Sequence, residues 1–85
     1  MTMLIAPHMA WQVIDSETVL VDLPNGRVMG LNPVASVIWS LLSDHDEAAI
    51  ADEVARRFEV DLATARLDVA EFIATLRQRG FLTAA

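Results

Sequence analysis

The side chains that could support acid–base or metal chemistry are two histidines, four serines and twelve acidic residues. Asp44-His45-Asp46 is the one stretch in which a histidine stands between two carboxylates, and both residue types ligate metals. Adjacent positions in a loop do not converge readily on one ion, however, and no second cluster completes a coordination shell. We therefore interpret this stretch as a loop and helix cap, because acidic groups at a helix start interact favourably with the helix dipole.

Motifs for catalysis are absent from the sequence. No serine has a base at a plausible spacing, and Asn25-Gly26 and Gly30 do not form a phosphate-binding glycine loop. Cysteine is absent, which excludes a disulfide framework and a cysteine-based zinc site. We predict no catalytic residue, no metal and no cofactor, so binding is the class of function that remains.

The composition favours one small domain that binds neither nucleic acid nor a membrane. Twelve acidic residues oppose six arginines, and the net charge of −6 repels a phosphate backbone. The longest apolar run, around residues 34–42, is about half of the ~20 residues that a bilayer span needs. Eighty-five residues leave no room for a second core, and the lack of cysteine fits a reducing compartment. We expect a single cytoplasmic domain over residues 1–85.

Turn and periodicity signals predict three strands followed by three helices. Residues 1–8 carry no pairing signal and Pro7 would break a ladder, so we expect a loose N-terminal arm there. β-branched residues and short turns predict strands, while apolar spacing with Asn32 and Asp61 as N-caps predicts helices. The expected elements are strands 11–14, 18–22 and 27–31 and helices 33–43, 47–58 and 62–79. This βββααα order predicts an α+β fold with an antiparallel sheet, arranged like a winged helix-turn-helix.

The third predicted helix divides into three sectors at about 100° per residue. A core sector holds Leu62, Ala65, Val69, Phe72, Ile73 and Leu76, and a solvent sector holds Thr64, Asp68, Glu71, Thr75 and Gln78. The shoulder between them consists of Ala63, Arg66, Leu67, Ala70, Ala74 and Arg77. This arginine shoulder is either ordinary helix filler, since alanine is the best helix former, or the wall of a shallow groove with cationic ends. The residues alone leave both interpretations open.

Two ordered sets of residues carry a resemblance to a known family. The first is Glu17-Thr18-Val19-Leu20-Val21-Asp22, Asn25-Gly26 and Leu31-Asn32-x-x-Ala35-x-x-Ile38-Trp39-x-Leu41-Leu42. The second is Ile50…Val54…Phe58-x-Val60-Asp61 and Asp68-Val69-x-x-Phe72-Ile73-x-x-Leu76-x-x-x-Gly80-Phe81-Leu82. Over about residues 11–82 the chain resembles the PqqD family, whose members include the peptide-binding domains called RiPP recognition elements.

The resemblance implies a non-catalytic chaperone that holds the leader of a ribosomally made precursor peptide and presents it to a modifying enzyme. In the family the leader adds as a strand beside the third strand and packs against the third helix. The implied site consists of Arg27, Val28, Met29, Gly30 and Leu31 with Ala63, Arg66, Leu67, Ala70, Ala74 and Arg77. Arg66 and Arg77 would then meet acidic leader residues. An exposed edge strand also permits a homodimer.

The pathway is less closely defined than the family. In PqqD itself the partner enzyme is a radical SAM protein and the product is pyrroloquinoline quinone. Members of that pathway usually carry a glycine where this chain has His45, and the pair Ile38-Trp39 is more typical of lasso peptide systems. The alternative from another class is a winged-helix DNA-binding protein, which needs a basic recognition helix. The second helix offers only Arg56-Arg57 beside Asp52-Glu53.

Overall fold

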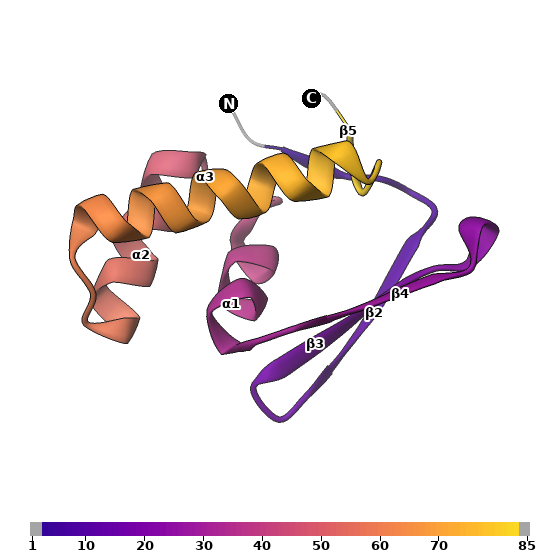
Figure 1. Ribbon diagram of the computed structural model, residues 1–85, viewed down its shortest axis with the longest axis horizontal. Coiled ribbons are helices and arrows are strands. Elements are labelled where there is room, and N and C mark those ends of the chain that lie inside the picture. Colours follow the sequence, from indigo (N-terminus) through magenta and orange to yellow (C-terminus); the bar gives the residue numbers. More distant parts are fainter. Residues whose placement is uncertain (1–2, 84–85) are drawn as a thin grey trace.

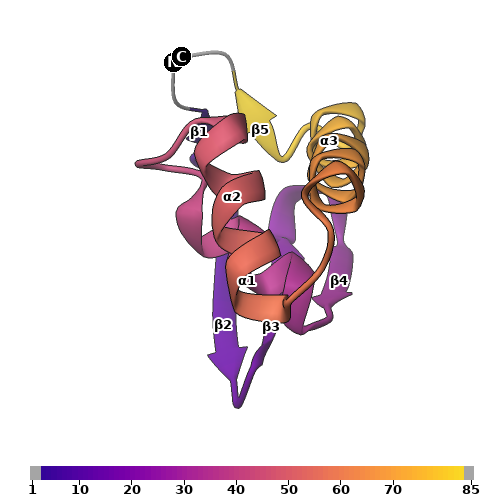
Figure 2. The same cartoon turned by 90° about the vertical axis from the view of Figure 1, so that its left-hand side faces the viewer.

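The computed structural model describes residues 3–83 and places three helices on one side of a small twisted sheet (Figures 1 and 2). Its elements are β1 (Leu4–Ile5), β2 (Met9–Ile14), β3 (Glu17–Asp22), a 3₁₀ turn (Leu23–Asn25), β4 (Arg27–Leu31), α1 (Pro33–Leu41), α2 (Glu47–Phe58), α3 (Leu62–Gln78) and β5 (Leu82–Thr83). The predicted α+β fold is confirmed, with an antiparallel three-stranded sheet that precedes three helices.

The order of the main sheet is β2-β3-β4, so both β2 and β4 are edge strands. The turn between β2 and β3 has two residues, and Asp15 adopts a positive φ of 58° there, as a tight hairpin turn requires. Between β3 and β4 the 3₁₀ turn ends at Gly26, whose φ of 64° suits a residue without a Cβ. Short local turns therefore fix the register of the whole sheet.

The N-terminal segment is paired, which corrects the expectation of a loose arm at residues 1–8. β1 pairs antiparallel with β5, with Leu4 opposite Thr83, and the Ala6 N–H donates to the Phe81 carbonyl oxygen at 2.9 Å. Met3 and Ala6 are buried in the core. Pro7 does not interrupt this ladder because it lies in the turn that follows it. The first two residues of the expected arm lie outside the described residues.

The core lies between the sheet and the helices, and the predicted apolar faces supply most of it. The largest fully buried side chains are Leu20, Ile38, Leu42, Ile50, Val54, Val69, Ile73, Leu76 and Phe81. The predicted N-caps are confirmed, because side-chain oxygens of Asn32 and Asp61 accept backbone N–H groups at the starts of α1 and α3. None of the helices within residues 3–83 is long and apolar enough to cross a membrane.

Candidate functional site: the edge of β4 and the α1–α3 hollow

The hydroxyl of Ser36 shows which way the backbone of β4 faces. The Thr18 N–H donates to Ser36 Oγ at 2.9 Å, and Ser36 Oγ donates to the Leu31 carbonyl oxygen at 3.3 Å. Thr18 and Leu31 are register partners, so the hydroxyl bridges an N–H and a C=O that face each other across β3 and β4. The two-residue β2–β3 turn leads to the same orientation. It directs the backbone N–H and C=O groups of Glu17 toward β2, and therefore those of Thr18 toward β4.

Backbone groups alternate along an antiparallel pair, and this fixes the rest of β4. Arg27 and Met29 direct their N–H and C=O groups toward β3, as Leu31 does. Val28 and Gly30 therefore direct theirs to the open edge, where no strand is paired in residues 3–83. Val28 is 72% exposed, and Gly30 has no side chain. An incoming chain would thus meet backbone donors and acceptors with little side-chain obstruction.

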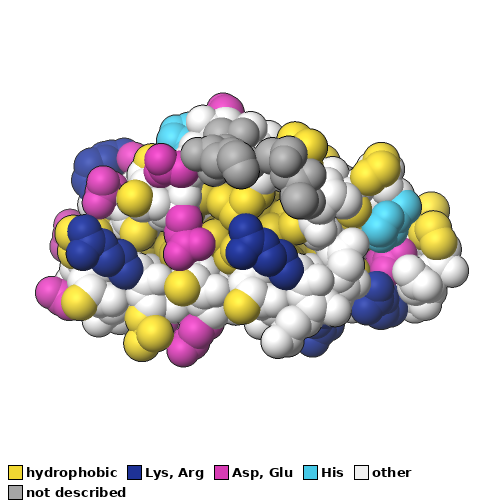
Figure 3. All heavy atoms as spheres, turned by 90° about the horizontal axis from the view of Figure 1, so that it is seen from above, with side chains coloured by type: hydrophobic (Ala, Val, Ile, Leu, Met, Phe, Trp, Pro, Cys, Tyr) yellow, Lys and Arg dark blue, Asp and Glu magenta, His cyan; other side chains and the backbone are white. Residues whose placement is uncertain are grey.

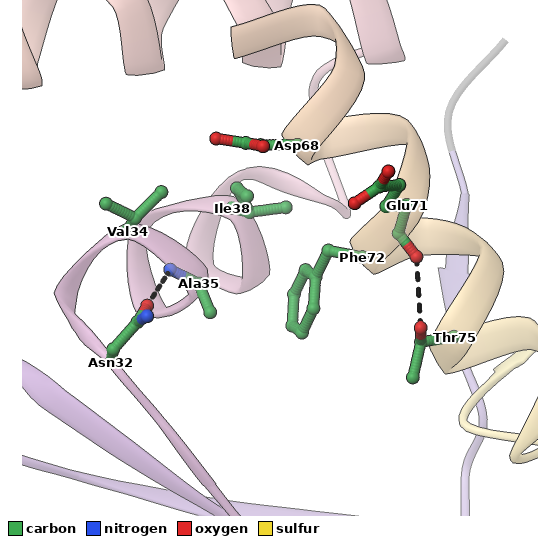
Figure 4. Close-up of a pocket in the computed structure, with 8 residues that line it drawn as sticks. All are labelled: Asn32, Val34, Ala35, Ile38, Asp68, Glu71, Phe72 and Thr75. Carbon is green, nitrogen blue, oxygen red and sulfur yellow. Dashed lines mark hydrogen bonds between the residues drawn. The ribbon is translucent and has the colours of Figure 1, made fainter. Parts of the chain in front are cut away.

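A hollow of about 350 Å³ opens between α1 and α3, next to the end of β4 (Figure 4). Its apolar lining is Val34, Ala35, Ile38 and Phe72, and its polar lining is Asn32, Asp68, Glu71 and Thr75. The Phe72 ring points from α3 toward α1 in Figure 4. Asn32 follows β4 directly and caps α1, so the free edge leads into this hollow. We call the free edge and the hollow together the β4–α3 groove.

The wall that α3 contributes to the groove is acidic. Asp68 and Glu71 are exposed; Figure 4 shows the Asp68 carboxylate extending from α3 toward α1 and the Glu71 carboxylate close to α3, above Phe72. Neither carboxylate forms an ion pair with another residue in the range 3–83. The groove therefore presents uncompensated negative charge on a chain whose net charge is already −6.

The other end of the groove is held by a buried carboxylate. Asp22 accepts hydrogen bonds from Arg27 Nη2 at 2.7 Å, Arg27 Nε at 3.0 Å and Asn25 Nδ2 at 3.0 Å. Arg27 Nη2 also donates to the Arg79 carbonyl oxygen at 2.7 Å, and its guanidinium lies 5.0 Å from the centroid of the Phe81 ring. These contacts tie the start of β4 to the C-terminal end of α3, so the Arg27 guanidinium is already engaged.

The protonation of Asp22 follows from this cluster. Burial alone would raise the pKa of Asp22. Hydrogen bonds from Asn25 and Arg27 lower it, as do the charges of Arg27 and His8, and together they outweigh the effect of burial. The net effect holds the pKa of Asp22 below its usual value. The carboxylate is therefore ionised over the physiological range and keeps the Arg27 contacts in place.

The arginine shoulder of α3 does not face β4. Arg66 lines a different hollow, together with Glu47, Ala48 and Ala51 of α2. Arg77 follows Arg66 by eleven residues, close to three helical turns, so helical spacing places it on the same side. Figure 3 views the molecule from above α3, and on that face arginine and acidic side chains are interspersed. The structure thus places Arg66 beside α2, and none of the shoulder residues is among those that line the hollow next to β4.

The residues of α3 that do line the groove were predicted for other roles. Phe72 was expected in the core but is only half-buried, and Asp68, Glu71 and Thr75 were expected to face solvent. The buried stripe of α3 has two borders, and the border that lines the hollow is the one with carboxylates, not the predicted one with small residues and arginines. Phe72 itself could have indicated the groove side of α3 from the sequence. It is a large aromatic residue at the border of the buried stripe, with carboxylates on its outer side.

The histidine stretch behaves as a helix start. Asp46 accepts the Ala49 N–H at 2.8 Å as the N-cap of α2, and His45 Nδ1 lies 2.7 Å from Asp44 Oδ1. Within residues 3–83, no group of three or more His, Cys, Asp or Glu side chains could hold a metal ion. The cap interpretation of Asp46 is therefore confirmed.

Comparisons with known proteins identify the family and similar folds. The family model described as "Coenzyme PQQ synthesis protein D (PqqD)" matches residues 17–82. TbiB1 in complex with the TbiA(beta) leader peptide is 32% identical, covers 98% of both chains and superposes with a TM-score of 0.89. A lasso peptide synthetase B1 complexed with its leader peptide is 26% identical, covers 98% of this chain and 99% of its own, and has a TM-score of 0.88. A search of curated proteins gave no match. The chain belongs to the PqqD family.

Proposed function

We propose that this protein is a RiPP recognition element that binds the leader of a ribosomally made precursor peptide in the β4–α3 groove. The leader adds to β4 as a further antiparallel or parallel strand, and its inward side chains enter the hollow between α1 and α3. The observation that carries the proposal is the free edge of β4 beside that hollow. Two structures of similar chains that hold leader peptides support it.

The two parts of the groove have different physical roles. The outward N–H and C=O groups of Val28 and Gly30 supply hydrogen bonds that any peptide backbone can make, so they give affinity with little sequence preference. The hollow admits side chains of limited size and polarity, so it supplies selectivity. An edge strand with a pocket beside it is the arrangement that β-strand addition requires.

The partners follow from this role. We propose that the protein is not an enzyme itself and that it hands the bound leader to a modifying enzyme in the cytoplasm. The two similar leader complexes, together with Ile38-Trp39 and His45, favour a lasso peptide system over the quinone pathway and its radical SAM enzyme. A homodimer through β4 would occupy the edge that the leader needs, so we expect the leader-bound form to have one copy of this chain.

Hydrogen exchange of backbone amides tests the proposal directly. Leader segments of precursor peptides encoded near this gene are added to the labelled protein, and exchange is followed residue by residue. Strand addition should slow exchange at Val28 and Gly30, whose N–H groups face outward, and should leave the outward N–H groups of Trp11 and Val13 on β2 unchanged. Protection on β2 instead of β4, or binding without protection of either edge, would contradict the proposed site.

The DNA-binding alternative finds no support in the charges of α2. Arg56 and Arg57 both donate hydrogen bonds to Glu53, and these bonds lower the pKa of Glu53. Both arginines thus share one carboxylate, and α2 as a whole has three acidic residues against these two arginines, so it presents no net positive charge to a phosphate backbone. A salt-dependent shift of duplex DNA at micromolar protein would revive this alternative.

A further inference from the structure

We infer that the leader recognised by this protein carries a lysine or arginine that lies over Asp68 and Glu71, next to an apolar side chain that enters the hollow. This inference rests on the proposed function and specifies the chemistry of its ligand. It also reverses the polarity expected from the arginine shoulder, which predicted an acidic leader.

The first step is the position of the two carboxylates. Asp68 and Glu71 are three residues apart on α3, a spacing that puts their Cβ atoms about 5–6 Å apart on one side of the helix. Both line the hollow, with Asp68 extended toward α1 and Glu71 close to α3 (Figure 4). One cationic group placed between them can therefore contact both.

The second step is the lack of any internal cation at this place. The remaining polar lining of the hollow, Asn32 and Thr75, is neutral. Arg27 is bound to Asp22 at the far end of β4, and Arg66 lines the hollow beside α2. Among residues 3–83 no positive side chain pairs with Asp68 or Glu71, so a cationic group of a ligand would find both carboxylates available.

The third step is the spacing of side chains on an added strand. Residues i and i+2 of a strand face the same side and lie about 6.5–7 Å apart. If one of them enters the apolar floor formed by Val34, Ile38 and Phe72, the next one on that side passes the carboxylates. The aliphatic stem of lysine or arginine can cover the Phe72 ring while its head group reaches Asp68 or Glu71.

The fourth step is the field of the whole protein. A net charge of −6 attracts a cationic segment and raises its association rate, while an acidic leader would be repelled both at long range and at the groove wall. Charge and local geometry thus favour the same ligand.

The test compares the two sides of α3 with neutral substitutions. The leader that binds in the exchange experiment is labelled with fluorescein, and its affinity is measured by anisotropy at low and high salt. The double variant Asp68→Asn/Glu71→Gln should weaken binding about fivefold to tenfold and reduce the salt dependence, the scale of one or two partly exposed ion pairs. The matched variant Arg66→Gln/Arg77→Gln removes two charges from the other side and should not weaken it.

A charge exchange separates this interaction from a general loss of fold. Replacing the leader's basic residue by glutamate should weaken binding to the native protein more than the neutral substitutions do, because repulsion is added to the lost attraction, and Asp68→Lys/Glu71→Lys should restore it. Equal affinity for the native protein and the Asp68→Asn/Glu71→Gln variant would overturn the inference and leave the proposed function standing. A larger loss in the arginine variant would also overturn it and would favour an acidic leader. Failure of every leader to bind the native protein would reject the proposed function and the inference with it.

Discussion

The two edges of the sheet, β4 and β2, expose the same backbone chemistry in different surroundings. Val28 and Gly30 direct N–H groups outward from β4, and by the same alternation Trp11 and Val13 do so from β2. Each edge also lies beside a hollow. The one beside β2 has about 310 Å³ and is lined by Val13, Ser16, Pro33, Ser36, Val37, Ser40 and Phe58, and we call it the β2 hollow.

The two edge strands differ in the side chains and helices that lie beside their exposed backbone. At β2 the side chains of the strand itself occupy the side of the sheet that faces the helices. Trp11 packs edge-to-face on Trp39 with 5.3 Å between ring centroids, and Val13 lines the β2 hollow. Its lining is neutral. At β4 the inner space is bounded by a separate helix, α3, which carries two uncompensated carboxylates. A free edge is thus common to both sides of the sheet, and the charged helical wall distinguishes the groove.

The largest expected difference between the edges comes from proline at outward N–H positions. Val28→Pro removes a hydrogen-bond donor and places a ring where an added strand must approach, so we expect at least a tenfold loss of leader affinity. Val13→Pro makes the same change on β2 and should leave the affinity unchanged. Anisotropy titrations measure both, and melting curves check that both variants fold. Equal losses in the two variants would remove the distinction between the edges.

A second comparison uses one phenylalanine from each hollow. Phe72 and Phe58 are both half-buried, and each lines one of the two hollows. Phe72→Ala should weaken leader binding about tenfold because it removes an apolar wall of the groove. Phe58→Ala should lower stability but not affinity. If Phe58→Ala weakened binding as much as Phe72→Ala, the β2 hollow would have to be part of the site.

Ser36 offers a smaller effect that depends on the link between β3 and β4. Ser36→Ala removes the hydroxyl between the Thr18 N–H and the Leu31 carbonyl oxygen, and we expect a loss of about 1–2 kcal/mol in the free energy of unfolding. Chemical denaturation measures this loss. Amide exchange should accelerate at Thr18, whose N–H loses its acceptor, and not at Gln12, whose N–H pairs β2 with β3. Acceleration along β2 instead would contradict the bridging role.

The smallest expected effect is a dependence of stability on acidity at the β4 end. The pKa of Asp22 is lower in the folded than in the unfolded chain, so its contribution is present above the unfolded pKa and is lost as pH falls through the lower, folded pKa. Asp22→Asn should therefore be less stable than the native protein near pH 7. This difference in stability should narrow as the pH falls below about 4. Thermal melts across this range measure the gap, and a constant gap would show that Asp22 does not titrate as described.

Local patterns were sufficient for most of the fold. Asn32 before Pro33, the apolar spacing of α2 and the turn at Gly26 act within a few residues, and the structure has the expected elements there. β1 and β5 could not be found in this way. Each has two residues, and their partners are separated by nearly the whole chain, so no local periodicity marks them.

The α3 wall of the candidate site was missed for a related reason. The sequence defines the buried stripe of α3 well through Ala65, Val69 and Ile73, but both borders of that stripe are compatible with the same pattern. Which border faces β4 depends on long-range contacts such as Arg27 with the Arg79 carbonyl. The strand part of the site could be predicted from the order of the strands in the sheet alone. The helix part could not, because it depends on how α3 packs against the rest of the fold.

The pairing of β1 with β5 has a consequence for how the domain can be joined to other chains. Leu4 and Thr83 are register partners, so the chain enters and leaves the described fold at neighbouring points. No residue that lines the hollow of the groove comes from β1 or β5. A short linker between these two points should therefore allow circular permutation, and a fusion through either end would hold a modifying enzyme at high effective concentration without covering the groove.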